Sequence, residues 1–204
     1  APIAGQVWYD STAIAFQYRS SNPAGTWATT SALNTAREQV AGAGTTTSGL
    51  VFGENFGGET ELYNGTNWTE VNDLNTSRRG PAGAGASNTA ALAFGGNLAA
   101  PSPNAATDET ETWNGTNWTE VNDLNQARVF LTGAGTNTAA IAIGGATGAG
   151  GNPPQTGEAE TWNGTNWTEV GDLNTARNSF ASGGTTTSAV AFGGSGPTAD
   201  TEVW

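Results

Sequence analysis

The side chains that could carry out chemistry are few in kind and recur along the chain. The sequence has 204 residues, with 18 Asp plus Glu, six arginines, and neither cysteine nor histidine. Without those two residue types the chain cannot form a Cys/His metal site, a thiol nucleophile, a His-based catalytic triad or a disulfide. The chemistry open to it is that of carboxylates and guanidinium groups.

Glutamates occupy the same two positions in each copy of a sequence repeat. A catalytic pair of carboxylates should be unique and asymmetric, whereas recurrence is typical of a scaffold. We therefore expect a solvated outer face and predict no catalytic residue and no cofactor. Glu54, Asp108 and Asp200 could bind Ca²⁺ with loop carbonyls, but no ligand-loop spacing supports a metal site. The recurring glutamates are Glu61, Glu70, Glu111, Glu120, Glu160 and Glu169.

Four arginines each follow a tryptophan by 10 residues. If the repeats form a ring, these arginines lie at the mouth of its channel, where they could bind an anionic group such as a sugar acid. We favour a structural role, in which each arginine pairs with a nearby aspartate or caps loop carbonyls between repeats. The arginines are Arg37, Arg78, Arg128 and Arg177, and the aspartates are Asp73, Asp123 and Asp172.

The repeat that positions these residues has three blocks. The first, Glu-Thr-Trp-Asn-Gly-Thr-Asn-Trp-Thr-Glu-Val, spans Glu111–Val121 and Glu160–Val170, with a near copy at Glu61–Val71. The second is Asp-Leu-Asn, two variable residues and Arg, and the third is an apolar run that ends in glycine. The successive periods between tryptophans are 41, 50 and 49 residues. Periods of about 40–50 residues with strand-like segments indicate the blades of a β-propeller.

Each repeat predicts four strands, which we call a to d. Strand a is the Ala-Gly segment, strand b the apolar run, strand c Glu-Thr-Trp, and strand d Asn-Trp-Thr-Glu-Val. The Asn-Gly pair between c and d predicts a two-residue type I′ hairpin. That hairpin would place Trp113 opposite Thr116 and Glu111 opposite Trp118. We expect the strand d tryptophans to pack between blades rather than to stack on sugars.

The pattern resembles the kelch family, whose repeats have a double glycine after strand b, aromatic residues in c and d, and an arginine near the next blade. Gly95-Gly96, Trp113, Trp118 and Arg128 match this pattern, and the resemblance covers residues 27–204. The near-identical copies and the segment Gly5–Thr12 also resemble repeat proteins of tailed bacteriophages, especially marine ones. This second resemblance implies a tail or fibre protein located in the virion, outside the cell.

The number of blades has two solutions. Segments 6–10 and 13–18 alternate like paired strands and lead to Trp27, so they could form a blade of their own. We favour this small ring of five blades because the predicted strands outnumber those that four blades require. In the alternative, residues 1–25 are an N-terminal hairpin, and the strand of Trp27 completes the last of four blades in a propeller of residues 26–204.

The loops between strands b and c carry nearly all the length variation of the repeat. They span 54–58, 97–108, 146–157 and 195–200, and the alternation of strands places them on the same face as the arginines. A constant scaffold with variable loops is typical of a binding surface, although loops also tolerate neutral insertions. Besides the arginines, the candidate ligand-binding residues are Asn97, Asp108, Asn152, Gln155 and Asp200.

Charge and the resemblance together define the expected function. A net charge of −12 disfavours nucleic acid, no basic face attracts anionic lipid, and no apolar run is long enough to span a membrane. We expect a non-enzymatic virion module that binds a host-surface glycan or receptor, or another virion protein. The alternatives are a purely architectural or engineered scaffold and, less favoured, a propeller glycosidase. The oligomeric state is left open.

Overall fold

The computed structural model contains two compact units, residues 1–31 and residues 32–204, which we describe separately. The structure describes residues 7–10, 15–18, 29–54, 57–98, 105–148, 154–195 and 199–204. In the first unit, β1 (Val7–Asp10) and β2 (Ala15–Tyr18) pair with each other as an antiparallel two-stranded sheet. All the regular elements among the described residues are strands. These described residues contain no helix that is long and apolar enough to cross a membrane.

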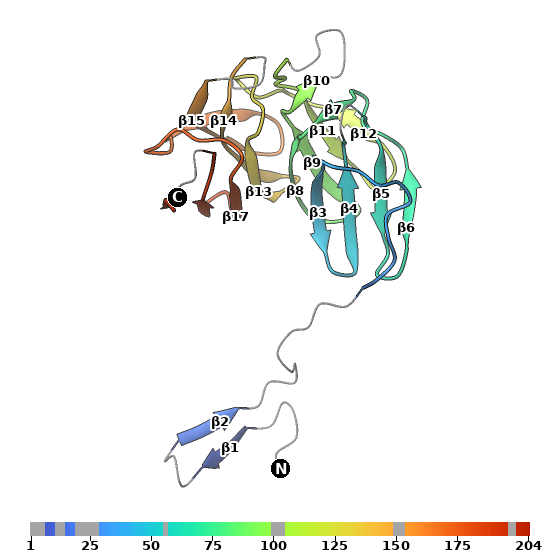
Figure 1. Ribbon diagram of the computed structural model, residues 1–204, viewed down its shortest axis with the longest axis vertical. Coiled ribbons are helices and arrows are strands. Elements are labelled where there is room, and N and C mark those ends of the chain that lie inside the picture. Colours follow the sequence, from blue (N-terminus) through green and yellow to red (C-terminus); the bar gives the residue numbers. More distant parts are fainter. Residues whose placement is uncertain are drawn as a thin grey trace. The chain divides into compact units, whose positions relative to one another are not determined.

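The second unit is a small β-propeller with four blades (Figure 1), so the all-β propeller prediction is confirmed. Blades one to three are four-stranded antiparallel sheets, and blade four has three described strands. Blade one is β3 (Ala41–Thr45), β4 (Ser48–Phe52), β5 (Thr60–Tyr63) and β6 (Trp68–Val71); blade two is β8 (Ala82–Ser87), β9 (Ala90–Phe94), β11 (Thr110–Trp113) and β12 (Trp118–Glu120). Blade three is β13 (Thr132–Thr136), β14 (Ala139–Ala146), β15 (Gln155–Trp162) and β16 (Trp167–Val170); blade four is β17 (Ala181–Thr185), β18 (Ser188–Phe192) and β19 (Thr201–Val203).

The preferred count of five blades is wrong, and the alternative of four blades is right. The strands that were to form a fifth blade, β1 and β2, pair only with each other in the described part of the chain. Their alternating sequence therefore marks a hairpin of its own, which strand counting cannot distinguish from part of a blade. The strand predicted around Trp27, which was to complete the last blade, falls largely outside the described residues.

The innermost strands of neighbouring blades pack side by side in chain order, β3 against β8, β8 against β13 and β13 against β17. All four of these strands line a central channel. Their small residues are required by close packing between blades. A Cβ atom placed on Gly83 would lie 2.8 Å from the ring of Phe52, and one on Gly133 would lie 2.4 Å from the ring of Phe94. Any side chain at these glycines would push neighbouring blades apart.

The loop between strands c and d is longer than the predicted two-residue hairpin. Trp113 pairs with Trp118 and Glu111 with Glu120, so four residues, Asn-Gly-Thr-Asn, form the loop. The side chain of Asn114 causes the difference, because its Oδ1 accepts the backbone N–H groups of Thr116 and Asn117, each at 2.9 Å. Gly115 follows with a φ of +93°, a value that glycine adopts without strain. The same loop recurs in blades one and three.

Tryptophans of strand d form the core between blades, as the sequence analysis predicts. Trp118 of blade two is 5% exposed and meets Phe52 of blade one edge-on, with ring centroids 4.9 Å apart. Trp167 of blade three repeats the contact with Phe94 of blade two, also at 4.9 Å. These aromatic contacts between consecutive blades bury large apolar surfaces and hold the blades in sequence. Trp68 of blade one is half-buried and packs on Tyr63 of its own blade.

Candidate functional site

The face of the propeller that carries the b–c loops also carries the segments that join one blade to the next. Where these meet, β7 (Arg78–Arg79) pairs with β10 (Asn97–Leu98). In Figure 1 this small sheet lies at the upper edge of the ribbon, and the c–d turn of blade one lies at the opposite edge. The arrangement gives the molecule one face of variable loops and one face of constant Asn-Gly turns.

The predicted loop residues differ in how accessible they are. Gln155, at the start of β15, and Asp200 are exposed, while Asp108 is half-buried. Asn97 is 2% exposed because it lies in β10, inside the face. Asn152 falls outside the residues that the structure describes. Gln155, Asp200 and Asp108 are therefore the described loop candidates that solvent can reach.

The four predicted arginines lie inside the wall of the propeller rather than on its surface. Their side chains are at most 2% exposed. Arg128 shows the contacts in full: its Nη2 donates to Glu160 Oε1 at 2.8 Å, and its Nη1 donates to the carbonyls of Glu158 and Gly144 at 2.6 and 3.0 Å. The arginines donate to loop carbonyls, which is one of the two structural roles expected from the sequence. The other expected role, pairing with the aspartates of the same block, is wrong, because the ion-pair partners are glutamates. The pairs are Arg37–Glu61, Arg78–Glu111, Arg128–Glu160 and Arg177–Glu202.

Each of these glutamates also binds the asparagine that lies three residues before the arginine. Glu111 Oε2 accepts the backbone N–H and the side-chain amide of Asn75, both at 2.8 Å, and Oε1 accepts the N–H of Thr76 and a guanidinium N–H of Arg78. The buried carboxylate therefore has four donors, which satisfies the requirement that a buried charge be paired and hydrogen-bonded. We call this set of contacts, repeated in every blade, the clasp.

The clasp overturns the expectation that the strand c glutamates lie on a solvated face. Glu61 and Glu111 are fully buried and Glu160 is 1% exposed. Only the strand d glutamates, such as Glu120 and Glu169, are exposed as predicted. The missed signal is the co-occurrence in each repeat of one Glu in strand c with one Asn-x-x-Arg. The paired residues lie 24 to 33 residues apart along the chain, and the recurrence of both charges once per repeat is the signal of an internal ion pair.

Two carboxylates near the b–c loops have perturbed acidity. Burial raises the pKa of Glu158, more than the attraction of Arg128 lowers it. Burial also raises the pKa of Glu54, and the neighbouring Glu59 adds to the effect by repulsion. In both cases the charged form is disfavoured by loss of water.

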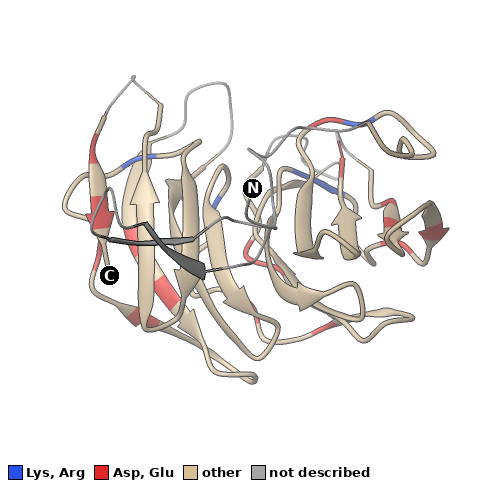
Figure 2. Ribbon diagram, turned by 90° about the horizontal axis from the view of Figure 1, so that it is seen from below, with Lys and Arg blue, Asp and Glu red and all other residues tan. Residues whose placement is uncertain are grey.

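Acidic residues are spread over the blades, as Figure 2 shows, and do not gather into one cluster. Within the described ranges, no group of three or more carboxylates is placed to hold a metal ion. No protein-family model matches the sequence, and a search of curated proteins finds no similar one. The function of the chain must therefore be argued from the geometry of its faces.

Proposed function

We propose that the protein is a binding module that uses its b–c loop face to attach to another molecule and does not catalyse a reaction. The observation that carries the proposal is the contrast between the two faces. The c–d turns of blades one to three share one four-residue loop held by the same asparagine contacts. The b–c connections join equivalent strands through segments of different length and sequence. Binding surfaces are commonly built in this way, with variable loops on a rigid scaffold.

The clasps supply the rigidity that such a surface needs. Each one joins the segment after one blade to strand c of the next blade, directly beneath a b–c loop. Because the loop carbonyls of Glu109 and Glu158 also accept from the arginines, the base of the loops is fixed. Fixed loop bases lower the entropy lost on binding. We therefore assign the arginines to the scaffold and the solvent-exposed Gln155 and Asp200 to the binding surface.

Neutral and acidic polar groups on this face favour a carbohydrate or a protein over an anionic polymer. The chain has a net charge of −12, which repels phosphate and sulfate groups. Amide and carboxylate side chains such as Gln155 and Asp200 can accept hydrogen bonds from sugar hydroxyls. Together with the resemblance to phage repeat proteins, this supports attachment to a host-surface glycan or to another virion protein, in the virion and outside the cell.

A glycan panel tests the proposal. The whole chain, labelled at an introduced surface cysteine, is applied to immobilised bacterial surface polysaccharides and to a purified capsid of a candidate phage. Saturable binding that Gln155→Ala or Asp200→Ala weakens supports the proposal. Thr165→Ala, in the c–d turn of the opposite face, is the matched control. The proposal is contradicted if the turn variant weakens binding and the two loop variants leave it unchanged.

The architectural alternative and the glycosidase alternative make different forecasts for the same panel. A scaffold without a ligand leaves every spot blank at high protein concentration. A glycosidase releases soluble sugar from one polysaccharide, and removal of one loop carboxylate abolishes that release. The recurrence of the clasp glutamates in every blade favours a scaffold role for them, because a catalytic pair would be asymmetric.

A further inference from the structure

The segment between each clasp and the innermost strand that follows contains one residue with a left-handed backbone. It is the second residue after the clasp arginine, and its φ lies between +54° and +58° in all four blades. Glycine adopts this conformation freely, whereas a residue with a Cβ atom does so at a steric cost. The position nevertheless holds a different residue in each blade. The four residues are Gln39, Gly80, Phe130 and Ser179.

The backbone of this position has a structural role that does not depend on the side chain. The N–H of Gly80 donates to the carbonyl of Gln39 at 2.8 Å, which links the entries of blades one and two. The N–H of Ser179 donates to the carbonyl of Phe130 at 2.9 Å, which links the entries of blades three and four. A Cβ atom placed on Gly80 would meet no atom within 4 Å. Phe130 is half-buried, but Gln39 and Ser179 are exposed, so packing does not explain why they replace glycine.

These residues lie at the entrance of the central channel, on the b–c face. The residues that follow Gln39, Gly80 and Phe130 line a cavity of about 270 Å³, which we call the channel mouth. The channel itself has a volume of about 680 Å³ and shares part of its wall with the mouth. A ligand that enters from the b–c face therefore passes the left-handed residues first. The three lining residues are Val40, Pro81 and Leu131.

The walls of the mouth and of the channel carry no ionisable side chain among the described residues. Most of the lining residues are glycine and alanine. Each innermost strand is also the edge strand of its sheet, and an edge strand presents unpaired N–H and C=O groups. The channel therefore offers many main-chain hydrogen-bonding groups and no charge, which suits an uncharged polar ligand.

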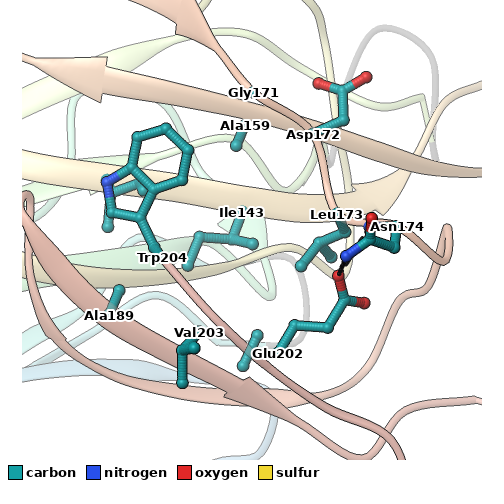
Figure 3. Close-up of a pocket in the computed structure, with 12 residues that line it drawn as sticks. Ile143, Ala159, Gly171, Asp172, Leu173, Asn174, Ala189, Glu202, Val203 and Trp204 are labelled. Atoms are coloured by element: carbon teal, nitrogen blue, oxygen red, sulfur yellow. Dashed lines mark hydrogen bonds between the residues drawn. The ribbon is translucent and has the colours of Figure 1, made fainter.

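Two cavities elsewhere in the protein differ from the channel because carboxylates line them. One, of about 70 Å³ between blades three and four, contains Asp172 and Glu202 (Figure 3). The Glu202 carboxylate accepts the side-chain amide of Asn174 at 2.8 Å, so it belongs to a clasp. The other contains Glu158, beside the clasp of blade three. The uncharged wall is thus a property of the channel and not of the protein's cavities in general.

We propose that the channel mouth binds the uncharged, non-reducing end of a host-surface glycan, and that Gln39 and Ser179 determine its specificity. This inference rests on the proposed function of the b–c face as a binding surface. The end of a peptide chain carries a charged amine or carboxylate, and burying a charge without a partner costs far more than burying hydroxyls that main-chain groups can pair. The Gln39 amide and the Ser179 hydroxyl can each donate and accept hydrogen bonds.

The probes are short neutral oligosaccharides of glucose, galactose, mannose and N-acetylglucosamine, labelled with fluorescein at the reducing end. Each is titrated with the full chain and followed by anisotropy. We expect saturable binding of at least one probe, weakened about tenfold or more when its non-reducing sugar is oxidised to a uronic acid or carries the label instead. Equal binding with the label at either end would show that the glycan lies across the face, and would overturn the inference. Binding of none of the probes would overturn it as well.

Glycine variants separate binding from folding. Gln39→Gly and Ser179→Gly relieve a left-handed residue at an exposed position, so each should unfold at the same or a higher urea concentration than wild type while binding weakens about tenfold or more. Gly80→Ala adds a Cβ atom in open space and should unfold at a lower urea concentration, which confirms the steric cost. Unchanged binding by both glycine variants, or lower stability of both, would overturn the inference.

Failure of this inference can be told apart from failure of the proposed function. Binding to the polysaccharide or capsid panel that Gln155→Ala or Asp200→Ala weakens, while Gln39→Gly and Ser179→Gly leave it unchanged, supports the loop face and overturns the role of the mouth. Weakening by the two glycine variants alone supports the mouth and shows that the loops are not needed. Thr116→Ala, in a turn of the opposite face, is the matched control and should bind like wild type.

Discussion

Arg128 Nη2 lies 2.8 Å from Glu160 Oε1, and both side chains are at most 2% exposed, so an ion pair joins two blades inside the protein wall. Arg128 belongs to the segment that follows blade two, and Glu160 belongs to strand β15 of blade three. Burial lowers the pKa of Arg128, although Glu160 acts in the opposite direction. The pair is one of four clasps, and it explains why Asn-x-x-Arg and a strand c glutamate recur together.

Breaking this clasp should destabilise the propeller strongly. Arg128→Met leaves the Glu160 carboxylate buried without its cation, which typically costs about 3–5 kcal/mol. Urea unfolding followed by tryptophan fluorescence measures the loss. Glu169→Gln, on the exposed strand d, is the control and should change the free energy of unfolding by less than about 0.5 kcal/mol. Equal stability of Arg128→Met and the control would show that the clasp does not hold the blades.

Tryptophans at equivalent positions should contribute unequally to stability. Trp118→Ala removes a ring that is 5% exposed and packs on Phe52, a change that costs about 3–5 kcal/mol. Trp68→Ala should cost clearly less, because Trp68 is half-buried and packs on Tyr63 of its own blade. Thermal unfolding of both variants compares them. The same loss in both would contradict the assignment of Trp118 to the core between blades.

The four-residue turn can be tested at Asn114. Asn114→Ala deletes the acceptor of two backbone N–H groups, those of Thr116 and Asn117, and should cost about 1 kcal/mol. Thr116→Ala changes an exposed side chain in the same loop and should be neutral. Chemical denaturation of the two variants gives the difference. A two-residue hairpin would make Asn114→Ala and Thr116→Ala equally mild.

The acidity of Glu158 gives a pH-dependent prediction. Because burial raises its pKa in the folded state, the charged carboxylate disfavours folding at neutral pH, and this cost disappears as pH falls below the ordinary value of 4.5. Glu158→Gln should therefore be slightly more stable than wild type at pH 7 and equally stable below pH 4.5. Denaturation curves at several pH values test it. A variant that is less stable at pH 7 would mean that attraction to Arg128 dominates.

The periodicity of the sequence was sufficient to predict that the chain forms propeller blades. It was not sufficient to predict the number of blades or the clasps. Small residues at 41–44 and 82–85, apolar runs and Asn-Gly pairs predict strands a to d, because strand type follows from local residue pattern. The predicted pairing of strands c and d was wrong because the Asn114 side chain, and not only the backbone, holds the loop between them. Glu111 was misplaced because its partners, Asn75 and Arg78, come from another blade, so that the pairing is visible only in the recurrence of both motifs along the chain and not in the local residue pattern.

Exchange of one loop tests the central claim, that the b–c face binds, most directly. The segment 147–154 of blade three is replaced by the shorter sequence 54–58 of blade one, and binding to the host glycan or virion protein found by the panel is measured beside wild type. As the matched control, Thr116 and Thr165 of the constant turns are changed to alanine. The account predicts that the loop exchange weakens binding by about tenfold or more while the turn variant binds like wild type. Unchanged binding by a folded loop-exchange variant would contradict it.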